Sequence, residues 1–217
     1  MPEIQRSEDR FLTTAEGTST RHSFSYGRHY DPDNIGFGQL IAINEETVEP
    51  GQGYDFHHHA DVEIVTWVLD GALLHEDTAG SRGVIGPGMA QRLSAGDGVQ
   101  HSERNSSKTE PLRFLQMMLR SDNTGEPSYE QSETGTVSVL NAKAELLLVE
   151  CHAGEMVHVP AFPFSYVHVT RGIVSAAEHL LRPGDALRLT DEGAYDVTAV
   201  AEGGDETAEV LIWQMQR

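Results

Sequence analysis

The sequence predicts an all-β protein with two similar domains, and three observations support this fold class. Short runs of valine, isoleucine, leucine and aromatic residues recur along the 217 residues, with Gly, Pro, Asp and Asn between them. Such runs, separated by frequent turn signals, are typical of strands in barrels and sandwiches. No segment keeps an apolar stripe at helical spacing over three turns. Two blocks of sequence recur in the same order, as in a duplicated domain.

Seven runs carry the strand pattern, and they lie on both sides of one polar segment. The predicted strands cover residues 37–44, 63–71, 114–119, 137–141, 145–152, 166–172 and 209–215. Residues 121–135 are polar, rich in chain-breaking residues and almost free of aliphatic side chains, which predicts a linker. We therefore expect an N-terminal domain at residues 1–125 and a C-terminal domain at residues 126–217.

The repeated blocks lie one in each expected domain. IGPGMAQRLSAGDG at 85–98 aligns with LRPGDALRLTDEGA at 181–194, and TWVLDG at 66–71 aligns with VHVTRG at 167–172. The offset between the copies is 101 residues in the upstream block and 96 in the downstream block. A shorter hairpin loop in the second copy accounts for that change, so the chain is expected to contain one duplicated β domain.

The charge balance excludes several classes of partner. Fifteen Lys and Arg against 34 Asp and Glu give a formal net charge of −19. Such a chain repels the phosphate backbone of nucleic acids and anionic lipid, and it favours a basic patch on any protein partner. The lone cysteine, Cys151, cannot form an internal disulfide and suits a reducing compartment. With no segment approaching the ~18–20 apolar residues of a membrane span, we expect a cytoplasmic protein.

Candidate metal ligands are concentrated in DFHHHADVE (55–63) and VQHSERN (99–105). Residues i and i+2 share one face of a strand, so His57 and His59 point together, as do His101 and Glu103. On adjacent strands of one barrel, the two pairs converge on a single interior position. Three imidazoles and a carboxylate suit one divalent transition metal: the carboxylate favours Fe(II) or Mn, and imidazole also suits Ni, Cu and Zn.

The same residues have other interpretations. A triple histidine can form a surface turn and a His-x-Glu pair can cap a strand, but their matched spacing favours a metal site. His75 and Asp77 form a further i, i+2 pair beside a turn, where stabilisation of a hairpin is favoured over ligation. Glu63, four residues after His59, is expected to orient an imidazole from behind rather than to bind the metal.

The spacing of these residues resembles the two motifs of the cupin superfamily. The pattern G-x5-H-x-H-x3-E occurs at Gly51, His57, His59 and Glu63. The second block, with Gly96, His101 and Asn105, looks like a variant second motif in which Ser94 replaces the proline. These departures and the His-x-Glu pair resemble the pirin family, strongly over roughly residues 20–131 and by architecture elsewhere.

This resemblance implies a bicupin: two tandem double-stranded β-helix (jelly-roll) barrels, with one metal, usually iron, in the N-terminal barrel. Carried over residue by residue, the metal ligands are His57, His59, His101 and Glu103. His58, where many relatives carry proline, is expected to face away from the metal.

Pirin-like proteins are associated with quercetin 2,3-dioxygenase activity, and the animal protein with transcriptional co-regulation. We therefore expect an Fe(II)-dependent dioxygenase that cleaves a flavonol such as quercetin with O₂, with Glu103 as the catalytic base. The alternative is a non-enzymatic, iron-dependent regulator that acts through protein–protein contacts. Phe37, Trp67 and Met118 are the expected apolar walls of a substrate pocket, with Gln116 as a polar contact.

The repeat also predicts that the second domain lacks the metal ligands. The two offsets carry the four ligand positions to His158, Pro160, Val197 and Ala199. Only one of these is a metal-binding residue type. We expect the second barrel to bind no metal at this position and His158 to be structural.

Overall fold

The computed structural model describes residues 2–133, 135–202 and 206–217, and strands dominate throughout. The predicted all-β fold is confirmed. The chain forms two compact units. One unit, called here the first barrel, contains Phe11–Gly36 and Leu40–Thr134. The other, called the second barrel, contains Met1–Arg10, Phe37–Gln39 and Gly135–Arg217.

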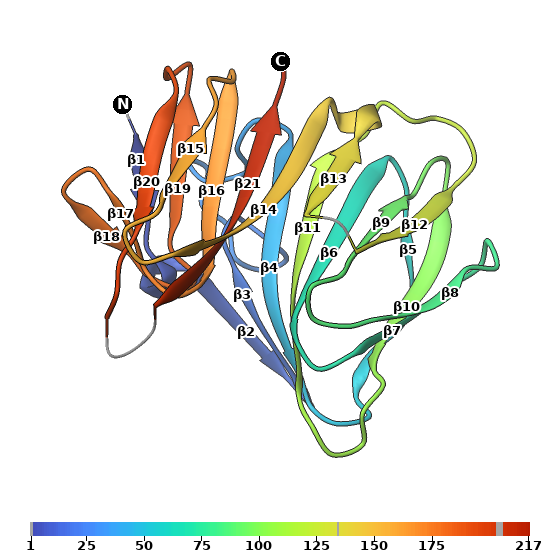
Figure 1. Cartoon of the computed structure of the whole chain (residues 1–217). Helices are drawn as coiled ribbons and strands as arrows, with labels where there is room; N and C mark the ends of the chain where they lie inside the picture. The colour runs from blue at the N-terminus through green and yellow to red at the C-terminus, as the bar shows by residue number, and fades with distance from the viewer. Residues whose placement is uncertain (1, 134, 203–205) are drawn as a thin grey trace. The chain divides into compact units, whose positions relative to one another are not determined.

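The first barrel consists of a large and a small antiparallel sheet (Figure 1). The large sheet has the strand order β12 (Ser128–Ser132), β9 (Ala90–Ser94), β6 (Val62–Asp70), β11 (Leu112–Arg120), β4 (Leu40–Val48), β3 (Thr18–His22), β2 (Phe11–Ala15). The small sheet has the order β5 (Gly53–His59), β10 (Val99–Asn105), β7 (Leu73–Asp77), β8 (Arg82–Ile85).

Alternation along the strands gives the first barrel two apolar clusters with polar residues between them. One cluster contains Ala42, Ile64 and Met118, and the other contains Val48, Val68 and Phe114. Between them on the same faces of β6, β11 and β4 lie Thr66, Gln116 and Asn44, which are cross-strand partners. The same row continues to Gln91 on β9 and His22 on β3. We call these five buried residues the polar row.

The second barrel repeats the arrangement of sheets. Its large sheet has the order β1 (Glu3–Gln5), β19 (Ala186–Thr190), β16 (Phe164–Arg171), β21 (Thr207–Met215), β14 (Ala144–His152), β13 (Thr136–Val139). Its small sheet has the order β15 (Met156–Val159), β20 (Tyr195–Ala199), β17 (Val174–Ala176), β18 (His179–Leu181). Its interior is a continuous apolar cluster that includes the lone cysteine, Cys151.

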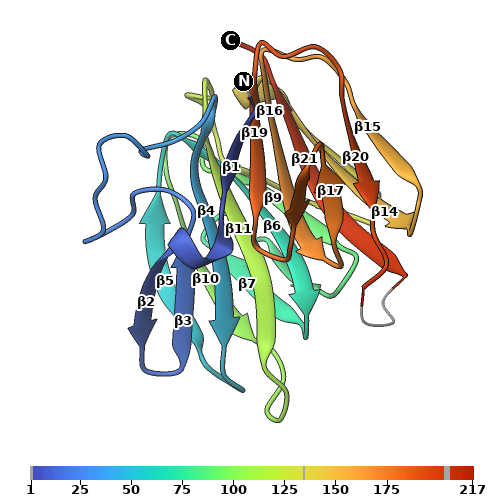
Figure 2. The ribbon, with the colours of Figure 1, turned by 90° about the vertical axis from the view of Figure 1, so that its left-hand side faces the viewer.

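Two segments differ from the sequence prediction. The expected linker contains β12, the edge strand of the large sheet, which pairs with β9 over five residues. Composition missed this strand because backbone pairing at a sheet edge does not require aliphatic side chains. The first residues of the chain, expected in the N-terminal domain, form β1 beside β19 of the second barrel, with Ile4 opposite Leu187 (Figure 2). Two short 3₁₀ turns, Ser7–Asp9 and Leu140–Ala142, complete the described elements.

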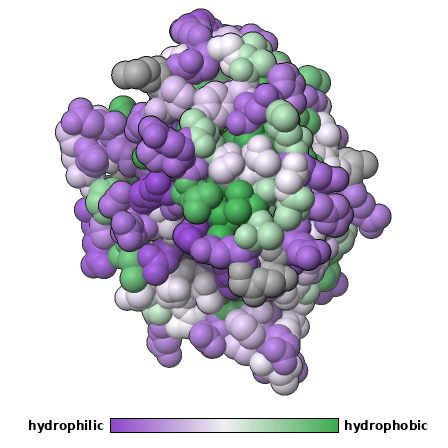
Figure 3. All heavy atoms as spheres, turned by 60° about the vertical axis from the view of Figure 1, so that its left-hand side comes forward, coloured by the Kyte–Doolittle hydropathy of each residue, from purple (hydrophilic) through white to green (hydrophobic). Residues whose placement is uncertain are grey.

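The surface agrees with the acid-rich composition. The face in Figure 3 is mostly hydrophilic and carries one smaller apolar area near its centre. Within the described ranges, the chain contains no helix with the length and hydropathy needed to cross a membrane.

Candidate metal centre

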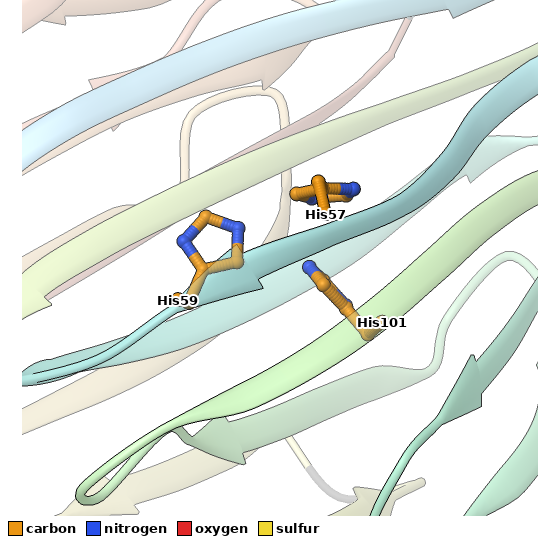
Figure 4. Close-up of side chains that lie close together, drawn as sticks. All are labelled: His57, His59 and His101. Atoms are coloured by element: carbon orange, nitrogen blue, oxygen red, sulfur yellow. The ribbon is translucent and has the colours of Figure 1, made fainter.

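Three imidazoles meet between β5 and β10 of the first barrel. These strands are antiparallel neighbours, with His57 directly opposite His101, and His59 follows on the same face of β5. The ring centroids lie 4.4 Å apart for His57–His101, 4.9 Å for His57–His59 and 5.0 Å for His59–His101. Figure 4 shows the three rings around a common space. His58, between the first two, is exposed as expected.

The hydrogen bonds leave nitrogen lone pairs available in this triad. Nδ1 of His57 donates to the backbone carbonyl of Asp55 at 2.9 Å, so its Nε2 carries no proton in the neutral ring. Nε2 of His59 and Nε2 of His101 are buried and have no hydrogen-bond partner among the described residues. An unpaired buried polar atom costs about 1–3 kcal/mol, which makes two together unusual unless a ligand satisfies them.

Burial keeps the two unpartnered imidazoles neutral. It lowers the pKa of His59 to about 4 and the pKa of His101 to about 2, and the charge of His57 lowers both further. One nitrogen of each ring in the triad lies within 4.8 Å of the others. Three imidazoles that each offer one nitrogen to a common space fit a divalent first-row transition metal.

Glu103 lies beside this triad in a second, overlapping group. Its carboxylate, His101 and His75 form another set of potential ligands within 4.8 Å of one another, so His101 belongs to both sets. The pairing of β10 with β5 shifts at a bulge between His101 and Glu103. The three histidines therefore lie together, as strand parity predicted. Glu103 lies beyond the bulge, where its partner on β5 is Tyr54.

The polar row holds the Glu103 carboxylate. Its two oxygens accept hydrogen bonds from Nε2 of Gln91, at 3.0 Å, and from Nε2 of Gln116. Burial raises the pKa of Glu103 to about 7; the two amides oppose this, and the charge of Glu46 adds to it. A carboxyl group with a pKa near neutrality can exchange a proton at physiological pH.

A buried His–Asp pair lies behind His101. Nδ1 of His75 is 3.5 Å from Nδ1 of His101, and Nε2 of His75 is 3.0 Å from a carboxylate oxygen of Asp77. The carboxylate accepts, so His75 donates from Nε2 and its Nδ1 can accept the Nδ1 proton of His101. The other oxygen of Asp77 accepts from the backbone N of Ser81. The pair therefore stabilises the hairpin, as expected, and also sets the tautomer of His101, which the sequence did not reveal.

A cavity of about 680 Å³ adjoins the triad, within the size range of small-molecule sites. His57, His59 and Glu103 line it, as do two of the expected wall residues, Gln116 and Met118. Phe37 does not: it belongs to the second barrel, where its ring packs edge-on against Phe164.

Trp67 is also absent from the described lining of the cavity. It follows Thr66 of the polar row on β6 and so points to the opposite face of the strand. Its buried position reflects packing on that side rather than contact with a ligand.

The sequence did not predict the polar side chains that line another part of the cavity. Glu46, Tyr54 and Thr20 form one hydrogen-bonded group in the lining, and His22 with Asn44 forms another. Local pattern gave little signal, because Asn44 and Glu46 lie in the polar stretch NEET (44–47) that ends an apolar run, and only strand parity separates their face from that of the other two residues.

The expectation that Glu63 orients an imidazole is wrong in its geometry. Its carboxylate accepts hydrogen bonds from Ser94 and Ser121, both at 2.7 Å, and pairs with Arg92. Parity from His59 assumed one regular strand, but Asp61 adopts a left-handed conformation (φ 58°) between β5 and β6. The two residues therefore lie on different strands.

In the second barrel, the buried positions of the corresponding strand pair hold no metal-binding residue type. Val157 on β15 is opposite Val197 on β20, where the first barrel places His57 opposite His101. His158 is exposed, and its Nδ1 is 2.8 Å from Asp196. The repeat offset matched His158 to His57, but the strand register places it one residue away, on the outer face.

Two similar barrels and a histidine triad in one of them define a bicupin whose candidate metal centre, among the described residues, lies in the first barrel. The chain belongs to the pirin family. A profile described as pirin matches residues 5–119, and a profile described as the C-terminal cupin domain of quercetinase matches residues 130–215.

Individual relatives agree with this assignment. A Mycobacterium bovis protein named "Putative quercetin 2,3-dioxygenase" is 43% identical over 98% of this chain and 94% of its own. The quercetin 2,3-dioxygenase of Escherichia coli K12 is 32% identical over 89% of this chain and 90% of its own. The structure of the E. coli bacterial pirin YhhW, in complex with nickel(II), matches with a TM-score of 0.90 at 28% identity and covers both chains fully.

Proposed function

We propose that this protein is a metal-dependent dioxygenase that cleaves a flavonol such as quercetin with O₂ in the first barrel. The observation that carries the proposal is the pair of buried, unpartnered nitrogens, Nε2 of His59 and Nε2 of His101, beside a ligand-sized cavity. The names of the relatives from M. bovis and E. coli support the reaction type.

The proposed ligands of one divalent metal are His57, His59, His101 and Glu103. Iron(II) is our first choice of metal, and the nickel(II) complex of the related bacterial pirin keeps nickel in view. When bound, such a metal supplies the redox and Lewis-acid chemistry that brings a flavonol and O₂ together, which side chains alone lack.

The residues of the chain prepare the site for this chemistry. His75 and Asp77 hold His101 in the tautomer that keeps Nε2 free. Gln91 and Gln116 hold Glu103 at the cavity, where its carboxylate is the proposed base for the proton of the flavonol 3-hydroxyl. Removal of that proton prepares the substrate for attack by O₂, which ends in ring cleavage and release of CO.

The test is single-turnover chemistry with a matched control. Metal-loaded protein is incubated with quercetin without oxygen, then pulsed with O₂, while flavonol absorbance and CO are followed. Wild type and His58→Ala are expected to bleach the flavonol and release CO, and His59→Ala to do neither. Loss of activity in His58→Ala to the same extent, or no CO from wild type with any of the candidate metals, would contradict the proposal.

A further inference from the structure

A second buried carboxyl group lines the same cavity and has no part in the chemistry proposed above. Glu46 lies on β4, two residues beyond Asn44 of the polar row, and only 5% of it is exposed. One of its oxygens, Oε2, accepts hydrogen bonds from Oγ1 of Thr20 at 2.5 Å and from the hydroxyl of Tyr54 at 2.6 Å. Both donors therefore meet the same oxygen.

The other oxygen of Glu46, Oε1, has no hydrogen-bond partner among the residues that the structure describes. If Glu46 served only to link β4 to β3 and β5, one hydrogen bond to each of its oxygens would satisfy both oxygens. Instead, one oxygen is saturated and the other keeps its full capacity to accept, on a side chain that lines the cavity. Oε1 is thus the oxygen of Glu46 that is left to accept a hydrogen bond from whatever occupies this cavity, which points to a ligand with a donor group.

Glu46 lies close to the candidate metal centre through its hydrogen-bond partner Tyr54. The Tyr54 ring, whose hydroxyl holds Glu46, lies 6.4 Å from the His57 ring, centroid to centroid. One tyrosine therefore separates the carboxyl group from the histidine triad. A ligand that reaches the triad at one end can present a polar group to Glu46 further along the same cavity.

The charges of the lining select the chemistry of that polar group. Glu46, Glu103 and Asp55 contribute three carboxyl groups to the cavity lining. Among the described lining residues, Arg28 is the one lysine or arginine. Asp55 is paired with Arg104. An anionic ligand group would meet two buried carboxyl groups, whereas an uncharged hydroxyl can donate to Oε1 without that repulsion.

We propose that Oε1 of Glu46 accepts a hydrogen bond from a ring hydroxyl of an uncharged phenolic ligand, so that Glu46 selects hydroxylated over unsubstituted or carboxylated aromatics. The assignment of that ligand as a polyhydroxylated flavonol rests on the proposed function, whereas the hydrogen bond itself does not. Glu46 is thus a specificity residue for the remote end of the substrate.

Binding without oxygen tests this with two flavonols and two variants. Quercetin carries ring hydroxyls that 3-hydroxyflavone lacks. In Glu46→Gln, the amide oxygen must still accept from Thr20 and Tyr54, so an NH₂ group that cannot accept replaces Oε1. By calorimetry, Glu46→Gln is expected to weaken quercetin binding about tenfold to a hundredfold, the effect of a lost hydrogen bond to a charged group, and to leave 3-hydroxyflavone binding unchanged.

The neighbouring residue supplies the control. Glu45 points to the opposite face of β4 and pairs with Arg113, so Glu45→Gln should bind both flavonols like wild type. Glu46→Asp, whose shorter side chain cannot reach its protein donors and the ligand together, should reproduce Glu46→Gln if the amide variant does not fold. Equal weakening of both flavonols, or no weakening of either, would overturn the inference.

A second measurement separates this inference from the proposed function. Saturation-transfer NMR with metal-free protein compares catechol with benzoate, which differ in offering hydroxyls or a carboxylate. Catechol binding that is lost in Glu46→Gln supports the role of Glu46 even if the protein neither binds nor cleaves quercetin, in which case only the proposed function fails. Benzoate binding as strong as catechol binding, or no Glu46-dependent binding of catechol, would overturn the role of Glu46.

Discussion

The two barrels share the same strand order in their small sheets but differ in the residues that face the barrel interior. In both small sheets the order is the same, with β5 next to β10 in the first barrel and β15 next to β20 in the second. The first of these pairs carries three imidazoles and a carboxyl group, and the second carries Val157, Val197 and Ala199 in buried positions. The barrel itself therefore does not make a site; the inward-facing residues of one strand pair do.

The larger sheets show the same contrast. The second barrel fills its interior with one continuous apolar cluster. In the first barrel, the polar row passes between two apolar clusters, and two of its amides hold Glu103. A barrel with a site gives up apolar packing for hydrogen bonds that are satisfied only when every member is present. The second barrel, with valine and alanine at the buried positions of the matching strand pair, keeps the packing. A polar substitution in that interior should therefore lower its stability, whereas loss of a polar residue from the first barrel should weaken metal binding.

The largest expected effect is loss of the imidazole that both ligand groups share. His101→Ala should weaken metal binding by more than about 100-fold, because loss of a ligand exceeds the 10- to 100-fold effect of losing a ligand's hydrogen-bond partner. Metal analysis after dialysis against a chelator should fall from about one ion per chain to near zero, with His58→Ala as control. Two ions per chain in wild type would contradict the contrast between the barrels.

The reverse change should damage the second barrel. Val197→His places an imidazole at the position opposite Val157, in an interior that offers it no polar partner among the described cluster residues. We expect the free energy of unfolding to fall by about 2–4 kcal/mol, from overpacking and from an unsatisfied buried polar group. Urea unfolding measures this. An unchanged midpoint would show that the second barrel tolerates polar residues as the first does.

A smaller effect is expected from the pair behind His101. Asp77→Asn leaves Nε2 of His75 without its carboxylate partner and weakens the control over the His101 tautomer. Metal affinity should fall about 10- to 100-fold. Glu76→Gln is the matched control, because Glu76 faces outward and pairs with Arg82. Equal affinities of the two variants, measured by competition with a metal indicator, would remove His75 and Asp77 from the site.

The histidine triad could be predicted because strand periodicity alone decides which side chains share a face. His57 and His59 are separated by one residue within a strand, and no long-range information is needed to place them together. The contact with His101 was predicted from the same parity on the assumption of adjacent strands, and the family resemblance implied the same residues. Each of the seven predicted strand runs overlaps an observed strand, since apolar runs between turn residues mark such strands directly, whereas the shorter and more polar strands were not predicted.

The errors arose where register or a turn intervened. Asp61 breaks the strand between His59 and Glu63, and a shift of one residue turned His158 outward. Glu46 was missed for a different reason. Its role depends on which of its oxygens meets Thr20 and Tyr54, and such pairing across strands is not encoded in local spacing.

The smallest expected effect is a pH dependence that only the first barrel should show. In metal-free protein the pKa of Glu103 is raised to about 7, so the carboxyl group takes up a proton below that pH. The pKa values of His59 and His101 are lowered to about 4 and about 2, so these rings stay neutral. Metal binding must then displace the Glu103 proton below pH 7, and no proton from His59 or His101 in that range.

Apparent metal affinity should therefore fall between pH 7 and 5.5, with Glu103 contributing about tenfold per pH unit, and be flat above pH 8. Glu103→Gln should bind metal more weakly and should lose this contribution to the slope, because its amide takes up no proton. A slope in Glu103→Gln as steep as that of wild type would assign the proton to another group and contradict the role given to Glu103.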